Sequence, residues 1–123
     1  MNFIISTKDA KIIYYSTKCH TAELIDKILK AYNDNSMDDS EKKEKIGRYG
    51  AAVAIRNIKT SSPKAVASAL KHRTFKLVEK IIKANNDNSL STEEKREKIN
   101  KYCLAIALRR GAIRTKNSNA KEE

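Results

Sequence analysis

The chain has one proline, three glycines and no tryptophan among its 123 residues. A β-sandwich or β-barrel needs many turns, and because glycine and proline dominate turns, their shortage argues against a sheet-rich fold. Cysteine is also scarce, with Cys19 and Cys103 alone. Two cysteines do not make the disulfide framework of a small secreted domain, so we expect reduced thiols.

Long apolar runs are missing as well. The longest uncharged apolar stretch, residues 102–108, is far shorter than the ~18 to 20 residues of a membrane span. Phe3-Ile4-Ile5 is too short for the core of a signal peptide. We therefore predict a cytoplasmic protein, although a protein exported without a leader or delivered into a host cell would carry the same signs.

The residues that are abundant favour helices. Lys, Glu, Ala, Ile and Leu dominate, and the hydrophobic share of 40% is enough for a folded core. A chain of this length suits one core better than two. We predict an all-α fold in a single domain over residues 1–114, followed by a disordered tail over residues 115–123.

An internal repeat organises the sequence. Residues 24–31 read Leu-Ile-Asp-Lys-Ile-Leu-Lys-Ala, and residues 77–84 read Leu-Val-Glu-Lys-Ile-Ile-Lys-Ala. The same shift of 53 positions aligns Asn-Asp-Asn-Ser at 33–36 with 86–89 and continues through the following segment. This predicts a tandem duplication of a three-helix unit, about 9–58 and about 62–111, packed as one compact domain or a short α-solenoid.

Each copy carries signals for helix boundaries. Apolar residues recur with helical spacing after Thr21 and Thr74, which we expect to be N-caps. Capping boxes are predicted at Asp38 with Glu41 and at Ser91 with Glu94. Residues 49–55 and 102–108, apolar on nearly every face and rich in alanine, should form the buried centre.

The first 18 residues leave two alternatives open. A helix over residues 9–18 would match the helix expected at 64–72, which begins with Ser62 and Pro63. The apolar clusters at 3–5 and 12–15 are also compatible with a hairpin. We favour the helix because of the repeat.

The segment 65–82 resembles the paired helices of an ankyrin-type repeat, in which a helix of small residues precedes an Ile-Val-x-x-Leu-Leu-like helix. It lacks the Thr-Pro-Leu-His opening and the turn glycine of that family, and the unit is longer by one helix. With Leu90-Ser91-Thr92-Glu93-Glu94-Lys95 it is also similar to helical effector proteins that bacteria deliver into host cells. The resemblance implies a protein-binding role.

The positive charge is concentrated in the second half. Residues 1–61 hold 11 Lys or Arg against 8 Asp or Glu, a net charge of +3, whereas residues 62–123 hold 15 against 7, a net charge of +8. Such a surface attracts acidic proteins or phosphates. We predict a non-enzymatic module that binds an acidic protein partner through its solvent-facing basic residues, namely Lys71, Arg73, Lys76, Arg109, Arg110 and Arg114.

A nucleic-acid-binding regulator, with DNA or RNA as the partner, is the alternative. Against it, Lys outnumbers Arg 19 to 7, whereas Arg is the better reader of phosphates and guanine. Many lysines also follow a glutamate at helical spacing, as in Glu94/Lys98 and Glu97/Lys101, which is typical of an ordinary solvated helix face. For the acidic-protein hypothesis, we further expect that reversing Arg109 and Arg110 to glutamate leaves the fold intact and abolishes partner capture.

Other kinds of site have weaker signals. Gly47-Arg48-Tyr49-Gly50 has the Gly-x-x-Gly spacing of a KH loop, but the second copy has no equivalent. Cys19, His20, His72 and Cys103 lack the close paired spacing of a zinc site, and the Asn-rich turns lack the glycine of a calcium loop. We therefore predict no catalytic residues, no metal and no cofactor, with no membrane or small-molecule partner.

Overall fold

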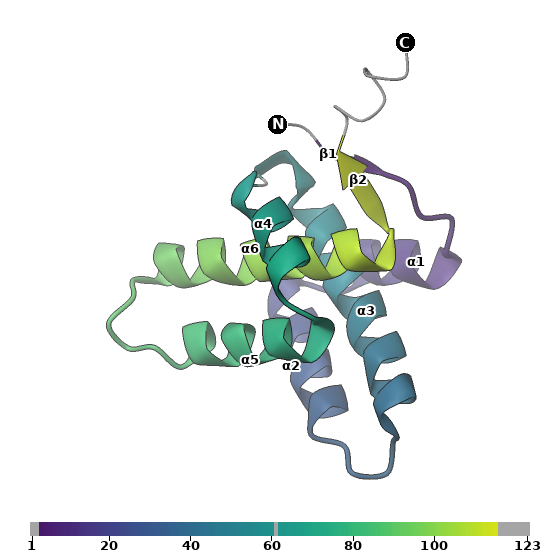
Figure 1. Ribbon diagram of the computed structural model, residues 1–123, viewed down its shortest axis with the longest axis horizontal. Coiled ribbons are helices and arrows are strands. Elements are labelled where there is room, and N and C mark those ends of the chain that lie inside the picture. The colour runs from purple at the N-terminus through teal and green to yellow at the C-terminus, as the bar shows by residue number, and fades with distance from the viewer. Residues whose placement is uncertain (1–2, 61, 116–123) are drawn as a thin grey trace.

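The computed structural model of the chain describes residues 3–60 and 62–115. Within them lie six α-helices and two short strands, and the all-α prediction is confirmed (Figure 1). The elements follow one another as β1 (Phe3–Ile5), α1 (Ala10–Lys18), α2 (Thr21–Tyr32), α3 (Asp39–Arg56), a 3-10 turn (Ile58–Thr60), α4 (Lys64–Lys71), α5 (Thr74–Asn85), α6 (Thr92–Arg110) and β2 (Ile113–Thr115).

The long helices α3 and α6 begin at the predicted capping boxes. At α3 the carboxylate of Asp38 accepts a hydrogen bond from the backbone N–H of Glu41 at 2.9 Å, and Glu41 accepts one from the backbone N–H of Asp38 at 3.3 Å. At α6 Ser91 and Glu94 make the same reciprocal pair at 3.1 and 2.9 Å. Both boxes satisfy backbone donors that a helix start leaves free.

Matching hydrogen bonds recur 53 residues apart. In the turn after α2, Asp34 accepts from the backbone N–H and the hydroxyl of Ser36 at 2.9 and 2.6 Å. In the turn after α5, Asp87 accepts from Ser89 at the same two distances. The two halves therefore share local structure as well as sequence. The helices after these turns start as predicted, but α2 and α5 begin one residue early.

The N-caps of α2 and α5 are His20 and Arg73, and the predicted caps Thr21 and Thr74 are the first helical residues. In α2 the backbone N–H of His20 is bound by the side chain of Glu23 at 3.2 Å. The position of that glutamate in α5 is held by Lys76, which cannot accept a hydrogen bond. The prediction was wrong because a threonine suits the cap and the first turn about equally well by pattern alone.

The favoured helix near the N-terminus is confirmed. Asp9 caps α1 by accepting from the backbone N–H of Lys11 at 2.9 Å. The apolar residues before it form β1, which pairs with β2 in an antiparallel ribbon, Phe3 opposite Thr115 and Ile5 opposite Ile113, and not with residues 12–15 as the hairpin alternative required. Thr115 of the predicted tail thus lies in a strand, and residues 116–123 lie outside the described residues.

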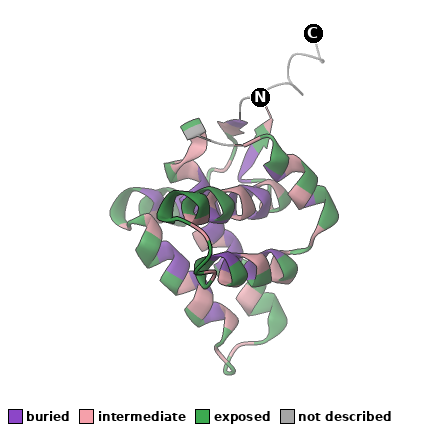
Figure 2. Cartoon of the chain, turned by 90° about the vertical axis from the view of Figure 1, so that its left-hand side faces the viewer, coloured by how far each residue is buried: buried purple, intermediate pink, exposed green. Residues whose placement is uncertain are grey.

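The core lies where α3 and α6 cross at the centre of the molecule (Figure 1). As predicted, the alanine-rich parts of both helices are buried, and the other helices turn their apolar faces toward them, as the purple segments of Figure 2 show. Gly50 of α3 allows a close approach, since a Cβ at this position would lie 2.8 Å from Cγ2 of Ile106 in α6. The small residues of α3 therefore set how closely the two halves approach.

Candidate partner-binding surface

Three of the predicted binding residues lie together where α4 gives way to α5. Lys71 ends α4, Arg73 caps α5 and Lys76 lies in the first turn of α5, and all three are exposed. Leu70, just before them, is 84% exposed, more than any other large hydrophobic residue of the described chain. We call Leu70, Lys71, Arg73 and Lys76 the basic turn.

The positive field of the basic turn acts on the imidazole of His72. Partial burial lowers the pKa of His72, and the ammonium groups of Lys80, Lys71 and Lys76 lower this pKa further. One carboxylate of α5 offsets the field in part, because Glu79 lies 3.6 Å from the ammonium group of Lys76. The cations of this turn are close enough to disfavour another positive charge among them.

Arg109 contributes to the basic turn from α6. Its Nη1 donates a hydrogen bond to the backbone carbonyl of Ala69 at the end of α4, at 2.9 Å. Arg56, 53 positions earlier, donates in the same way to the carbonyl of Ser16 at 2.8 Å. Since each guanidinium ties the end of its third helix to its first, Arg109 holds the basic turn in place as well as adding charge to it.

Arg110 forms its polar contacts with Glu44 of α3 and with Asp9 before α1. Its Nη2 lies 2.9 Å from Oε1 of Glu44 and 3.5 Å from Oδ2 of Asp9, and its Nη1 donates to the backbone carbonyl of Glu44 at 3.3 Å. The hydrogen bond and the charge of Arg110 lower the pKa of Glu44. Both predicted arginines of α6 thus hold intramolecular bonds, so the expectation that reversing them leaves the fold intact needs correction.

Arg114 is separate from the other predicted residues. It is exposed on β2, opposite Ile4 of β1. The two-stranded ribbon lies beyond the end of α6 (Figure 1), whereas the basic turn lies beside the last turns of α6, where Arg109 bonds to Ala69. The structure therefore gathers Lys71, Arg73, Lys76 and Arg109 at one place, and it leaves Arg110 and Arg114 apart from them.

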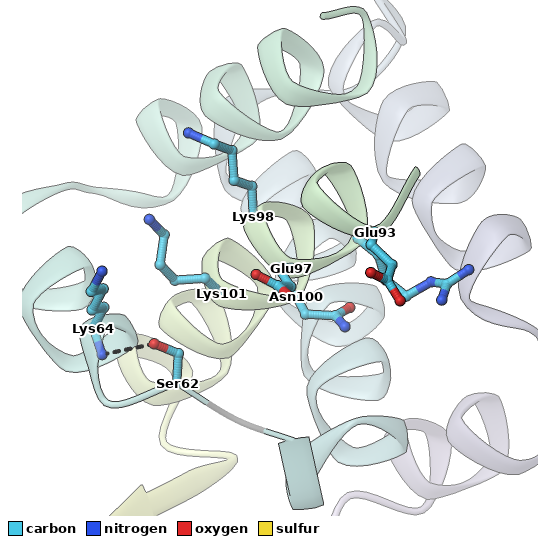
Figure 3. Close-up of a pocket in the computed structure, with 8 residues that line it drawn as sticks. Ser62, Lys64, Glu93, Glu97, Lys98, Asn100 and Lys101 are labelled. Carbon is cyan, nitrogen blue, oxygen red and sulfur yellow. Dashed lines mark hydrogen bonds between the residues drawn. The ribbon is translucent and has the colours of Figure 1, made fainter. Parts of the chain in front are cut away.

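A second group of cations lines a pocket between the start of α4 and the first half of α6, with a volume of about 730 Å³. We call it the lysine pocket. In Figure 3 the side chains of Lys64, Lys98 and Lys101 extend to one side, and Glu93 lies on the other. Its lining residues are Ser62, Lys64, Glu93, Arg96, Glu97, Lys98, Asn100 and Lys101. Sequence reasoning did not single out this set, because its members become neighbours only when α4 packs on α6.

The glutamates at helical spacing act on these lysines at longer range: the pKa of Glu94 is lowered mainly by its hydrogen bonds with Ser91 and further by the charge of Lys98. Within the described part of the chain, neither Glu94 with Lys98 nor Glu97 with Lys101 forms an ion pair shorter than 4.0 Å. Lys101 instead places its ammonium group 4.8 Å from the centre of the Tyr102 ring. The charge of the lysine pocket is thus less balanced than helical spacing alone indicated.

The structure also bears on the thiol, Gly-x-x-Gly and metal sites considered in the sequence. Cys103 is completely buried, and burial raises its pKa to about 12, which keeps the thiol protonated and unreactive at neutral pH. Gly47 and Gly50 lie inside α3, so they do not form the loop of a KH domain. Among the residues that the structure describes, no three His, Cys, Asp or Glu side chains are grouped to hold a metal, and no helix could cross a bilayer.

Comparisons with known proteins do not add a family to this geometry. No protein-family model, curated protein or solved structure matches the chain. The two helices expected over residues 65–82 are present as α4 and α5, and helices alone do not assign a family. The exposed residues of the chain itself are therefore the evidence for what it binds.

Proposed function

We propose that this chain is a non-enzymatic binding module that attaches to an acidic protein surface through its basic turn. The observation that carries the proposal is an exposed leucine followed closely in the chain by exposed cations: Leu70 is 84% exposed, and Lys71, Arg73 and Lys76 lie within the next six residues. Protein interfaces commonly combine an apolar centre with a charged rim. An acidic partner with a small apolar depression would cover Leu70 and face the cations.

The exposed leucine favours a protein over a nucleic acid as the partner. A phosphate backbone is bound by cations and polar groups, and unpaired bases are bound by stacking on aromatic rings or guanidinium planes. Leu70 does neither, whereas burying its side chain in a protein interface would contribute about 1.5 to 3 kcal/mol. Arg109 supports the same role. Because its hydrogen bond fixes the end of α4 before binding, less conformational entropy is lost when a partner binds.

The first half of the chain offers a matched reference for this surface. The positions 53 before Leu70, Arg73 and Lys76 are Thr17, His20 and Glu23, so the equivalent turn between α1 and α2 has neither the leucine nor the two cations. Lys18 and Lys71 correspond directly. The apolar and basic character is therefore specific to the second turn.

This difference gives a direct test of the proposed function. In the triple variant Leu70→Thr, Arg73→His and Lys76→Glu, the second turn takes the residues of the first. We expect unchanged helical circular dichroism and at least about tenfold weaker partner capture, since an apolar anchor and two charges are lost together. Capture is measured by quantitative mass spectrometry on nuclease-treated extracts, followed by titration of the purified partner.

The control is the double variant Lys18→Glu and Lys30→Gln, which lowers the formal net charge by the same amount at pH 7 on the other half. It should capture the same partner as the wild type. Equal capture by the wild type, the triple variant and the control would refute the role of the basic turn. A captured component that is lost on nuclease treatment, with a steep salt dependence for random duplex DNA or RNA, would support the nucleic-acid alternative instead.

A further inference from the structure

The first half of the chain has a carboxylate, that of Asp9, at a position where the second half has an uncharged serine, Ser62. Asp9 caps α1 through Lys11, and its carboxylate also lies 3.5 Å from Nη2 of Arg110. The position 53 later is Ser62, whose hydroxyl accepts from the backbone N–H of Lys64 at 3.2 Å. Ser62 thus makes the same capping bond with an uncharged group, so the cations near it have no carboxylate at this place.

The cations around Ser62 are held close together. Burial lowers the pKa of Lys101, and the positive charges of Lys98 and Lys64 lower this pKa further. The residue 53 before Lys101 is Arg48, which lies 3.4 Å from Oε1 of Glu44. The first half therefore neutralises its cation, whereas the second half leaves three ammonium groups beside an open pocket (Figure 3).

We infer that the lysine pocket binds a small polyanion that carries two or more phosphate groups, with Lys64, Lys98 and Lys101 as its counter-charges. The pocket volume of about 730 Å³ lies in the range of small-molecule sites, which is about 300 to 1,000 Å³, and it exceeds what a single phosphate would fill. Lysine ammonium groups act as point charges that adapt to several phosphate oxygens without the fixed geometry of arginine. Glu93 and Glu97 also line the pocket and repel an anion, so we expect the polyanion on the side of the three lysines, away from Glu93 (Figure 3).

The first experiment uses the wild-type chain with inorganic tripolyphosphate as the probe. We expect saturable shifts of backbone amide resonances at Ser62, Lys64 and residues 96–101, with weaker or no shifts for sulfate at the same ionic strength. Shifts spread over lysines on all helices, or no saturation, would overturn the proposal, because they would show nonspecific attraction to a basic protein.

Two variants then separate a specific pocket from general charge. Ser62→Asp supplies the carboxylate found in the first half and can still accept the hydrogen bond from the backbone N–H of Lys64, and it should weaken tripolyphosphate binding about tenfold or more because the added negative charge repels the anion. It should also raise the melting temperature without ligand. The double variant Lys98→Gln and Lys101→Gln should weaken binding at least as much.

The matched control is Lys11→Gln with Lys45→Gln, the residues 53 before Lys64 and Lys98. It should bind tripolyphosphate like the wild type, and an equal loss in this control would refute the pocket. The site is independent of the basic turn, so the triple variant of Leu70, Arg73 and Lys76 should keep full tripolyphosphate binding. Failure of the pocket and failure of the proposed function are thereby told apart.

Discussion

Valine at position 50 is expected to lower the free energy of unfolding by about 3 kcal/mol, because the α3–α6 crossing has no room for it. Even a single Cβ at Gly50 would lie 2.8 Å from Cγ2 and 3.2 Å from Cβ of Ile106. Ile106 is buried and β-branched, so it cannot turn aside without moving α6. Urea unfolding followed by circular dichroism measures the change.

Gly47→Ala is the control for this prediction. A Cβ at Gly47 would lie 2.9 Å from Nη1 of Arg110, which belongs to a flexible side chain. We expect a stability within about 1 kcal/mol of the wild type, since the higher helix propensity of alanine offsets a small shift of Arg110. If Gly50→Val were as stable as Gly47→Ala, the close approach of α3 and α6 would not be a constraint on the fold.

The second large effect is expected at Arg110. Glutamate at this position removes two hydrogen bonds to Glu44 and puts a third carboxylate beside Glu44 and Asp9. Bonds to charged groups contribute about 1.5 to 3 kcal/mol, and because the side chain of Glu44 is 55% exposed to water we expect a loss near the lower end of that range, about 2 kcal/mol. Thermal unfolding at pH 7 measures it.

The pH dependence gives this prediction a sign. The pKa of Glu44 is lowered mainly by its hydrogen bond to Arg110, and the pKa of Asp9 is lowered mainly by the backbone N–H of Lys11, with help from Arg48 and Arg110. A lowered pKa stabilises the fold above the pKa of the unfolded chain, and this contribution disappears as the pH falls through the folded value. The stability gap between the wild type and Arg110→Glu should therefore shrink on acidification. A gap that stays constant from pH 7 to acid would show that Arg110 acts through packing alone.

The helices could be predicted from the sequence because their signals are local. The capping boxes at Asp38 and Ser91 and the turn at residues 33–36 depend on side chains that bind backbone groups within a few residues. The partner of residues 3–5 could not be predicted, because β1 pairs with a strand more than 100 residues away. Local pattern carries no information about such a pairing.

The candidate site also has a part that local sequence could predict and a part that depends on tertiary packing. Lys71, Arg73 and Lys76 are neighbours in the sequence, so a local charge count found the basic turn. The bonds of Arg110 to Glu44 and the grouping of Lys64 with Lys98 depend on how α3 and α4 pack against α6. These contacts join distant segments, and a count of nearby charges assigned them to open solvent.

The pairing of β1 with β2 has a consequence for folding during synthesis of the chain. Since Phe3 pairs with Thr115, β1 cannot find its partner until more than 100 further residues have left the ribosome. Until α6 emerges, the side of α3 at Gly50 that meets Ile106 is uncovered, although α1 and α2 can already pack against the rest of α3. A nascent chain released before Ile113 would therefore present an unpaired strand and an uncovered helix face, which are the features that chaperones and proteases recognise in unfinished proteins.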